Sequence, residues 1–295
     1  MTAIFGFPLP LLLGQLTLGL VSGTFYAMLA LGLAVIFGLM DVINFAHGAF
    51  FMMGAMFVWM GNRYLHLGYW TMLLLAPALV AVIGALFQLL LLRRLRGMDP
   101  LYGLLLTFGA ALLLQGLFRA FFGAAGEPYN PPLQLSGTLD LHFMFLPAYD
   151  AFAVCASVVA CALTWGLIER TRIGSMLRAG TEHPALAQAF GINVPVLACL
   201  TFAFGSGLAA LAGALAAPIE QVSPLMGSNL IVVVFAIVVI GGMGSVSGAI
   251  VSGLALGLIE AVAKVLYAPV SNTIVFLFMA LVLTLRPAGL FGKER

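Results

Sequence analysis

Long apolar runs with almost no charged residues fill most of this chain, and they decide its fold class. The hydrocarbon core of a bilayer is about 30 Å thick, so a helix needs about 20 apolar residues to cross it. Only 7% of the residues are charged, whereas a soluble domain carries about 25%. A chain of this composition cannot cover its surface with polar groups. We therefore predict an all-α, polytopic membrane protein.

Eight apolar runs are candidates for membrane-spanning helices, and a ninth is interrupted. The eight lie near Pro10–Leu39, Thr71–Leu92, Leu101–Phe122, Ala148–Ile168, Leu197–Ala217, Gly227–Gly242, Gly248–Ala268 and, as a shorter run, Ser271–Leu285. The ninth run, Ile43–Met60, is broken near its start by Asn44, His47 and glycine. The sequence therefore predicts eight or nine transmembrane helices, with re-entrant or broken segments, in one transmembrane domain that covers residues 1–295.

Basic residues orient the predicted bundle, because cytoplasmic loops carry an excess of Lys and Arg. Nine of the twelve basic residues form three groups on one side: Arg93, Arg94 and Arg96; Arg170, Arg172 and Arg178; Arg286, Lys293 and Arg295. The loop at 123–147 lies on the other side and has no Lys or Arg. We expect the first side to face the cytoplasm. The C-terminus is then cytoplasmic, and the N-terminus is outside if the run at 43–60 crosses.

The longest predicted cytoplasmic connection, residues 169–195, contains a candidate amphipathic helix. Thr181 is a good N-cap, Glu182 complements the positive end of the helix dipole, and Gly191 can end the helix in a left-handed conformation. Three apolar residues share one face of this helix: Leu186, Ala189 and Phe190. The spacing leaves two interpretations open. The helix rests on lipid head groups, or it inserts into a groove on a cytoplasmic partner.

Polar residues and glycines interrupt two of the apolar runs, one in each half of the chain. The first break contains Asn44, His47 and Gly48, and the second contains Gly241, Gly242, Gly244 and Ser245. Polar groups at membrane depth usually face a bundle interior or a water-filled path. Paired breaks of this kind point to the central path of a transporter. We interpret both as re-entrant or pathway segments. Hydrogen bonds that hold a turn are favoured over direct solute contact, and tight helix packing also explains the glycines.

Three segments of the sequence resemble the LivH-type permease subunits of branched-chain amino acid ABC importers. They are LMDVINFAHGAFFMMG at Leu39–Gly54, RIGSMLRAGTEHPALAQAFGIN at Arg172–Asn193 and VVIGGMGSVSGAIVSG at Val238–Gly253. The resemblance covers nearly the whole chain. It implies a type II ABC-importer permease of a bacterial inner membrane, in which Thr181–Gly191 is the coupling helix that docks onto an ATPase subunit.

The same resemblance implies the partners of the chain. They are a second homologous permease, two ATP-binding cassette subunits, a periplasmic substrate-binding protein and the lipid bilayer. The sequence contains no G-x-x-x-x-G-K-[ST] motif, so ATP hydrolysis is expected on other chains. We expect a transport subunit rather than an enzyme, with no catalytic residue, cofactor or metal site. The net charge of +2 gives no reason to expect nucleic acid as a partner.

Three alternative functions have different requirements. A secondary transporter or channel would need charged coupling sites within the membrane. Only Glu260 and Lys264 offer such a site, and they stand at i, i+4, where they could neutralise one another. A membrane hydrolase finds no support, because no G-x-S-x-G motif occurs. Related ABC permeases also serve urea and short amides, and these residues do not separate those solutes from branched-chain amino acids.

Overall fold

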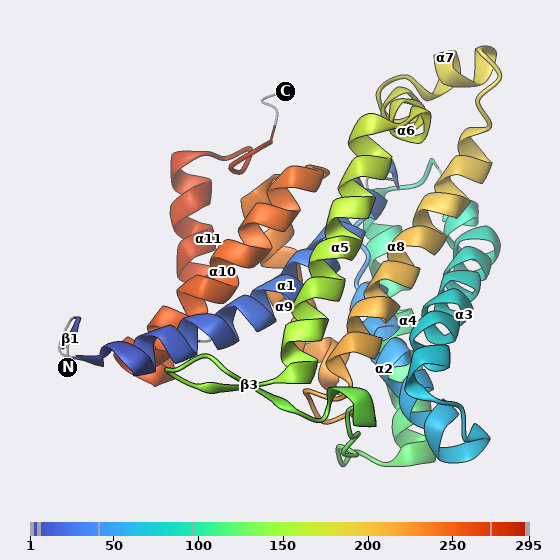
Figure 1. Cartoon of the computed structure of the whole chain (residues 1–295). Helices are drawn as coiled ribbons and strands as arrows, with labels where there is room; N and C mark the ends of the chain where they lie inside the picture. The colour runs from blue at the N-terminus through green and yellow to red at the C-terminus, as the bar shows by residue number, and fades with distance from the viewer. Residues whose placement is uncertain (1–2, 5–6, 41, 96, 272, 293–295) are drawn as a thin grey trace.

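The protein is mostly helical in its structure, a computed structural model that describes residues 3–4, 7–40, 42–95, 97–271 and 273–292 (Figure 1). Asp41 and the basic residues Arg96, Lys293 and Arg295 lie outside the described residues. The α-helices are α1 (Leu9–Met40), α2 (Ala46–Leu65), α3 (Tyr69–Leu90), α4 (Pro100–Phe122), α5 (Ala148–Arg170), α6 (Arg172–Glu182), α7 (Pro184–Ala189), α8 (Val194–Ala216), α9 (Met226–Gly241), α10 (Val246–Tyr267) and α11 (Ile274–Leu285). The 3-10 turns are η1 (Leu92–Leu95), η2 (Leu133–Leu135) and η3 (Ala268–Val270).

Each of the nine apolar runs forms a helix, with ends that differ from the predicted ones by at most five residues. Six segments of the described chain have the length and hydropathy needed to cross a membrane: Leu9–Met40, Tyr69–Leu95, Pro100–Phe122, Ala148–Arg170, Val194–Ala216 and Val246–Val270. Helices α9 and α11 are apolar but shorter. Six candidate spans confirm a polytopic protein, while the count of eight or nine crossings stays a prediction.

Glycines let the central helices approach one another closely. Helix α1 runs obliquely through the bundle and packs along α10 (Figure 1). A Cβ added at Gly257 would lie 2.4 Å from the Cα of Gly23, and one added at Gly253 would lie 2.5 Å from the Cα of Ala27. Small residues at four-residue spacing on both helices therefore allow their backbones to touch. Helix α2 lies in the interior beside α8, and more than half of its residues are buried.

Two short antiparallel sheets depart from the predicted all-α fold. Strands β1 (Ala3–Ile4) and β2 (Phe7–Pro8) pair near the N-terminus. Strands β3 (Thr138–Asp140) and β4 (Phe145–Pro147) form a hairpin inside the loop at 123–147, with Leu139 opposite Leu146. A further bridge joins Glu127 to Val222, so the loops after α4 and α8 lie at the same end of the bundle.

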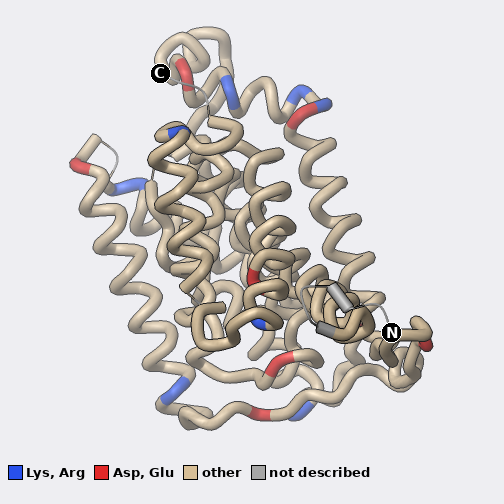
Figure 2. Tube along the Cα trace, turned by 90° about the vertical axis from the view of Figure 1, so that its left-hand side faces the viewer, with Lys and Arg blue, Asp and Glu red and all other residues tan. Residues whose placement is uncertain are grey.

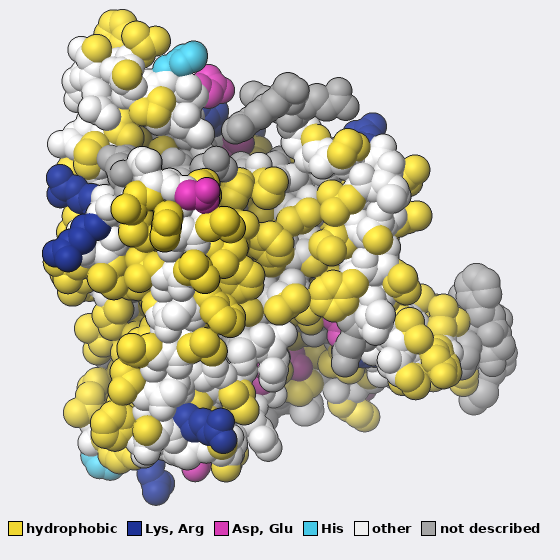
Figure 3. Space-filling model, turned by 180° about the vertical axis from the view of Figure 1, so that it is seen from behind, with side chains coloured by type: hydrophobic (Ala, Val, Ile, Leu, Met, Phe, Trp, Pro, Cys, Tyr) yellow, Lys and Arg dark blue, Asp and Glu magenta, His cyan; other side chains and the backbone are white. Residues whose placement is uncertain are grey.

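The two ends of the bundle differ in charge. One end carries α6 and α7, and the opposite end carries the β3–β4 hairpin (Figure 1). Lys and Arg gather at the end that carries α6 and the C-terminal segment (Figure 2). Between the ends, hydrophobic side chains cover the middle of the rear face, and most charged side chains of that face lie toward its ends (Figure 3). This distribution suits a protein with a lipid-facing belt.

Candidate translocation and coupling site

The first break lies between the end of α1 at Met40 and the start of α2 at Ala46. A side chain from α4 supplies hydrogen bonds for its backbone. Thr107 Oγ1 accepts from the Phe45 amide at 3.2 Å and lies 3.1 Å from the Ile43 carbonyl oxygen, to which it can donate. Thr107 is fully buried. Sequence reasoning missed this residue, and its only signal was a single threonine within the apolar run of α4.

Asn44 lies in this break and His47 lies in the first turn of α2, and both side chains are buried. His47 Nε2 is 3.0 Å from the Leu29 carbonyl oxygen of α1, in agreement with the interpretation that it bonds to a backbone carbonyl. The side-chain oxygen and nitrogen of Asn44 and the Nδ1 of His47 have no hydrogen-bond partner among the described residues. The two residues therefore differ, because His47 joins α2 to α1 whereas the carboxamide of Asn44 makes no bond to the described chain.

This difference predicts different consequences for the two apolar substitutions. His47→Leu removes the bond to Leu29 and is expected to lower the melting temperature of the purified protein. Asn44→Leu removes an amide that bonds to nothing described, and a buried polar group without a partner costs about 1–3 kcal/mol. Its melting temperature should therefore stay equal or rise, while uptake falls. Thermal unfolding in detergent and uptake in vesicles measure both effects. Melting temperatures and uptake equal to those of the wild-type protein, for both variants, would contradict a role for this segment.

The second break lies between α9 and α10, and glycines form it. Gly242 and Gly244 have φ angles of +99° and +82°, a region that favours glycine. Ser245 caps α10, because its hydroxyl accepts from the Gly248 amide at 3.1 Å. The C-terminal segment closes over the break, where the Leu290 amide donates to the Ile240 carbonyl at 2.8 Å.

The second break touches the last turn of α1 at the end of the bundle that carries α6. A Cβ added at Gly244 would lie 3.2 Å from the Cα of Gly38, which is in the last turn of α1. The hydroxyl of Thr181 in α6 donates to the carbonyl oxygen of the same Gly38 at 3.0 Å. The segment predicted to couple to a partner therefore touches the end of α1 directly, next to the second break.

The prediction of a single helix that starts at Thr181 and ends at Gly191 is wrong about where the helix starts. The structure has two helices there, and Thr181 and Glu182 lie in the last turn of α6 instead of the first turn of a new helix. Thr181 does not cap a helix, because its hydroxyl bonds to Leu177 and Gly38. His183 separates the helices, because the residue before a proline is disfavoured in helical conformation, and Pro184 then begins α7.

The end of the predicted helix is as expected. Gly191 has a φ angle of +84° after the last residues of α7. The Gly191 amide donates to Gln188 and the Ile192 amide donates to Ala187, both at 3.0 Å, which is a Schellman ending. Leu186, Ala189 and Phe190 are all exposed, and Phe190 is 85% exposed. The protruding tip that contains α7 presents hydrophobic side chains at the upper left of Figure 3.

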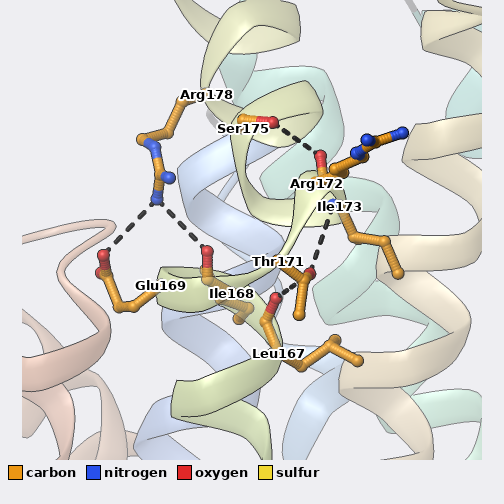
Figure 4. Close-up of polar contacts among 8 residues, drawn as sticks. All are labelled: Leu167, Ile168, Glu169, Thr171, Arg172, Ile173, Ser175 and Arg178. Carbon is orange, nitrogen blue, oxygen red and sulfur yellow. Dashed lines mark hydrogen bonds and ion pairs between the residues drawn. The ribbon is translucent and has the colours of Figure 1, made fainter.

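A tight corner joins α5 to α6 and holds the tip in place (Figure 4). The guanidinium of Arg178 donates to the Ile168 carbonyl at 3.3 Å and lies 3.5 Å from the Glu169 carboxylate. Thr171 caps α6 by accepting from the Ile173 amide at 3.3 Å. At Gly174 a Cβ would lie 1.5 Å from the Ile168 carbonyl oxygen, so only glycine fits there.

A cavity of about 1240 Å³ opens at this end of the bundle. Its walls come from the end of α1, η1, the α5–α6 corner, the start of α8 and the second break. Of the predicted site residues, four line it: Thr181, Glu182, Gly244 and Ser245. Val42 of the first break also lines this cavity, whereas Asn44 of the break and His47 and Gly48 of α2 do not. The structure thus joins the second break to the coupling segment, and it places Asn44 and His47 deeper in the bundle.

Glu260 and Lys264 form the expected neutralising pair. Their charged groups are 2.8 Å apart, and the Tyr26 hydroxyl of α1 donates to the Glu260 carboxylate at 2.9 Å. Glu260 is buried, whereas the Lys264 side chain is 45% exposed. Sequence spacing found the pair but did not find Tyr26. With both of its oxygens occupied, Glu260 serves the contact between α1 and α10.

Several apolar spans, two breaks next to helix ends and a protruding tip with exposed apolar side chains define a polytopic membrane protein and are the features expected of a permease. The chain matches the family described as branched-chain amino acid transport system / permease component over residues 15–285. It belongs to that family, and the resemblance drawn from the three sequence segments is confirmed.

Curated relatives cover almost the whole chain. The high-affinity branched-chain amino acid transport system permease protein BraD of Pseudomonas aeruginosa is 29% identical, over 95% of this chain and 96% of the relative. The permease protein LivH of Escherichia coli (strain K12) is 28% identical over 95% and 96%. The probable permease protein LivH of Methanocaldococcus jannaschii is 26% identical over 90% and 88%. No solved structure matches the chain.

Proposed function

We propose that this chain is the membrane-spanning permease subunit of an ATP-driven importer that carries branched-chain amino acids into the cytoplasm by alternating access. The observation that carries this proposal is the family match over residues 15–285. The names of the curated relatives agree on the solute class. The chain contributes no covalent chemistry, and ATP is hydrolysed on separate subunits.

The proposed complex contains a second homologous permease, two ATP-binding cassette subunits and a periplasmic substrate-binding protein. Residues 1–295 form one transmembrane domain of type II architecture in the bacterial inner membrane, and the coupling loop is residues 169–195. The apolar tip at Leu186 and Phe190 supports the docking role, since both side chains are exposed in the isolated chain. Helices α9 and α11, although short, complete the crossings.

The proposed topology makes a prediction that labelling can test. Arg94 and Arg172 are expected to face the cytoplasm, and Asn130 and Gly137 the periplasm, because the basic groups mark the inner side. Lys293, also expected inside, lies outside the described residues. Single cysteines at these sites, in a variant without Cys155, Cys161 and Cys199, should react with a membrane-impermeant maleimide from the predicted side. Labelling of position 172 from outside intact cells would reverse the orientation.

Transport by the reconstituted complex tests the function itself. Proteoliposomes that contain all subunits should take up labelled leucine only with ATP and the binding protein, and unlabelled isoleucine and valine should compete. Uptake without ATP would support a secondary transporter or channel instead. Competition by urea or short amides, and not by valine, would assign the chain to the amide importers.

A further inference from the structure

Gln88 is a buried polar residue of α3, and the apolar pattern of this helix does not explain why a carboxamide stands there. The buried face of α3 consists of one residue per turn: Tyr69, Met72, Ala76, Val80, Gly84 and Gln88. Helix α3 packs mainly against α8, and a Cβ added at Gly84 would lie 2.0 Å from the Ser206 hydroxyl oxygen of that helix. Gln88 continues this face at its inner end, yet it carries a carboxamide. It is 3% exposed, and its Oε1 has no hydrogen-bond partner among the described residues.

Gln88 also lines the cavity of about 1240 Å³. The lining residues differ in exposure, and we call the exposed ones the mouth of the cavity and the buried ones its deep part. At the mouth, Arg93 and Met98 are exposed. In the deep part, four apolar lining residues are buried: Ala34, Val35, Leu92 and Ala198. Gln88 belongs to the deep part, so a polar carboxamide is set within an apolar wall.

This combination has the chemistry of a small-molecule site. Ligand sites are mostly apolar pockets with a few placed polar groups, and they have volumes of about 300–1,000 Å³. The cavity is larger than this range, so it has room for a solute together with water. A carboxamide both accepts and donates hydrogen bonds. It can therefore accept from an ammonium group and donate to a carboxylate, while the apolar wall receives an aliphatic side chain.

We propose that Gln88 and the surrounding apolar wall form an inner binding site for the zwitterionic amino acid, occupied before the solute leaves to the cytoplasm. The proposal rests on the proposed function, because it takes the solute to be a branched-chain amino acid. It adds a specificity-determining residue that is distinct from the two broken segments. The ammonium and carboxylate of the solute meet the carboxamide, and its branched side chain lies against the apolar wall.

Gln88→Met is the decisive substitution, because methionine has a similar size and shape but no hydrogen-bonding amide. If Gln88 binds the solute, the melting temperature of the variant complex should equal or exceed that of the wild-type complex. Its leucine uptake should fall at least about tenfold. A structural glutamine would give the opposite pattern, with a lower melting temperature and normal uptake per folded complex. That result, or normal uptake at an unchanged melting temperature, overturns the proposal.

A reporter cysteine detects the solute without requiring transport. Leu92→Cys places a thiol in the wall of the cavity, in a complex whose native cysteines are replaced. A small thiol reagent added to inside-out vesicles should label it, and leucine should slow the labelling at least about threefold. The carboxylate 4-methylpentanoate, which lacks the ammonium group, should protect much less. In the Gln88→Met background the protection by leucine should disappear.

Met98→Cys at the mouth of the same cavity is the matched control, and its labelling should not respond to leucine. Failure of the Leu92→Cys thiol to react from the cytoplasmic side, or equal labelling with and without leucine, overturns the inner site. Leucine uptake by the wild-type complex separates the two proposals. Uptake without protection refutes only the inner site, whereas a complex that takes up no branched-chain amino acid refutes the proposed function.

Discussion

Replacing Phe190 and Leu186 together by alanine is expected to release the ATPase subunits while the permease stays in the membrane at its normal level. Both side chains project from the tip that α7 forms, and Phe190 is 85% exposed. Truncation of an aromatic anchor in an interface typically costs about 2 kcal/mol or more of association. The substitutions should spare folding, because neither side chain contributes to the buried core. Recovery of ATPase with the affinity-purified permease, normalised to permease amount, measures the effect.

The opposite end of the bundle offers a matched control for this pair. Leu133 and Phe145 are also a leucine and a phenylalanine, and they are 89% and 71% exposed. Their double substitution by alanine removes a similar apolar area at the far end of the bundle and should leave ATPase recovery unchanged. Normal recovery with the Phe190 and Leu186 variant would mean that the tip rests on lipid head groups. That result would refute the proposed docking of the tip onto an ATPase subunit.

The second large effect is expected in the core, where Gly54→Ala should prevent the protein from folding. A Cβ at Gly54 would lie 2.0 Å from the carbonyl oxygen of Ala210 in α8. The opposing Gly213 is equally tight, since its Cβ would lie 1.9 Å from the Phe51 carbonyl oxygen of α2. The neighbours are backbone atoms, so relief requires α2 and α8 to separate. We expect a loss of about 3 kcal/mol or more, seen as aggregated or degraded protein in size-exclusion chromatography.

Gly109→Ala is the control for this prediction, because it makes the same chemical change in a helix that is mostly exposed. Nothing lies within 4 Å of a Cβ added at Gly109 in α4. Alanine also favours a helix interior over glycine by about 0.5–1 kcal/mol. The control variant should therefore be as stable as the parent or slightly more stable. A Gly54→Ala protein with a normal elution profile and melting temperature would show that the α2–α8 contact can relax.

Helix positions could be predicted from the sequence because hydropathy is a local property of the chain. The run Leu101–Phe122 and helix α4 differ by one residue at the start and agree at the end. The two breaks were also recognisable, since glycines and polar residues stand out in an apolar run. Gly191 was correctly placed because a left-handed helix end depends on local sequence.

Contacts between distant parts of the chain could not be predicted in this way. Thr181 has the residue type of an N-cap, and only the position of α1 explains why its hydroxyl bonds to Gly38 instead. Thr107 supports the first break from another helix, 62 residues away from Phe45. Gln88 was overlooked because its importance depends on the cavity that surrounds it. Each of these roles arises from tertiary packing, which a single sequence does not reveal.

The corner between α5 and α6 makes these two helices the arms of a bent lever. Helix α5 has 23 residues and α6 has 11, which correspond to lengths of about 34 Å and 16 Å at the standard helical rise. Arg178 ties the arms together, and Gly174 lets them touch without a side chain between them. When the two arms turn as one body about the corner, a displacement at the end of α6 becomes about twice as large at the far end of α5. In the proposed complex, small movements of an ATPase docked at the tip would thus be magnified toward the opposite side of the membrane.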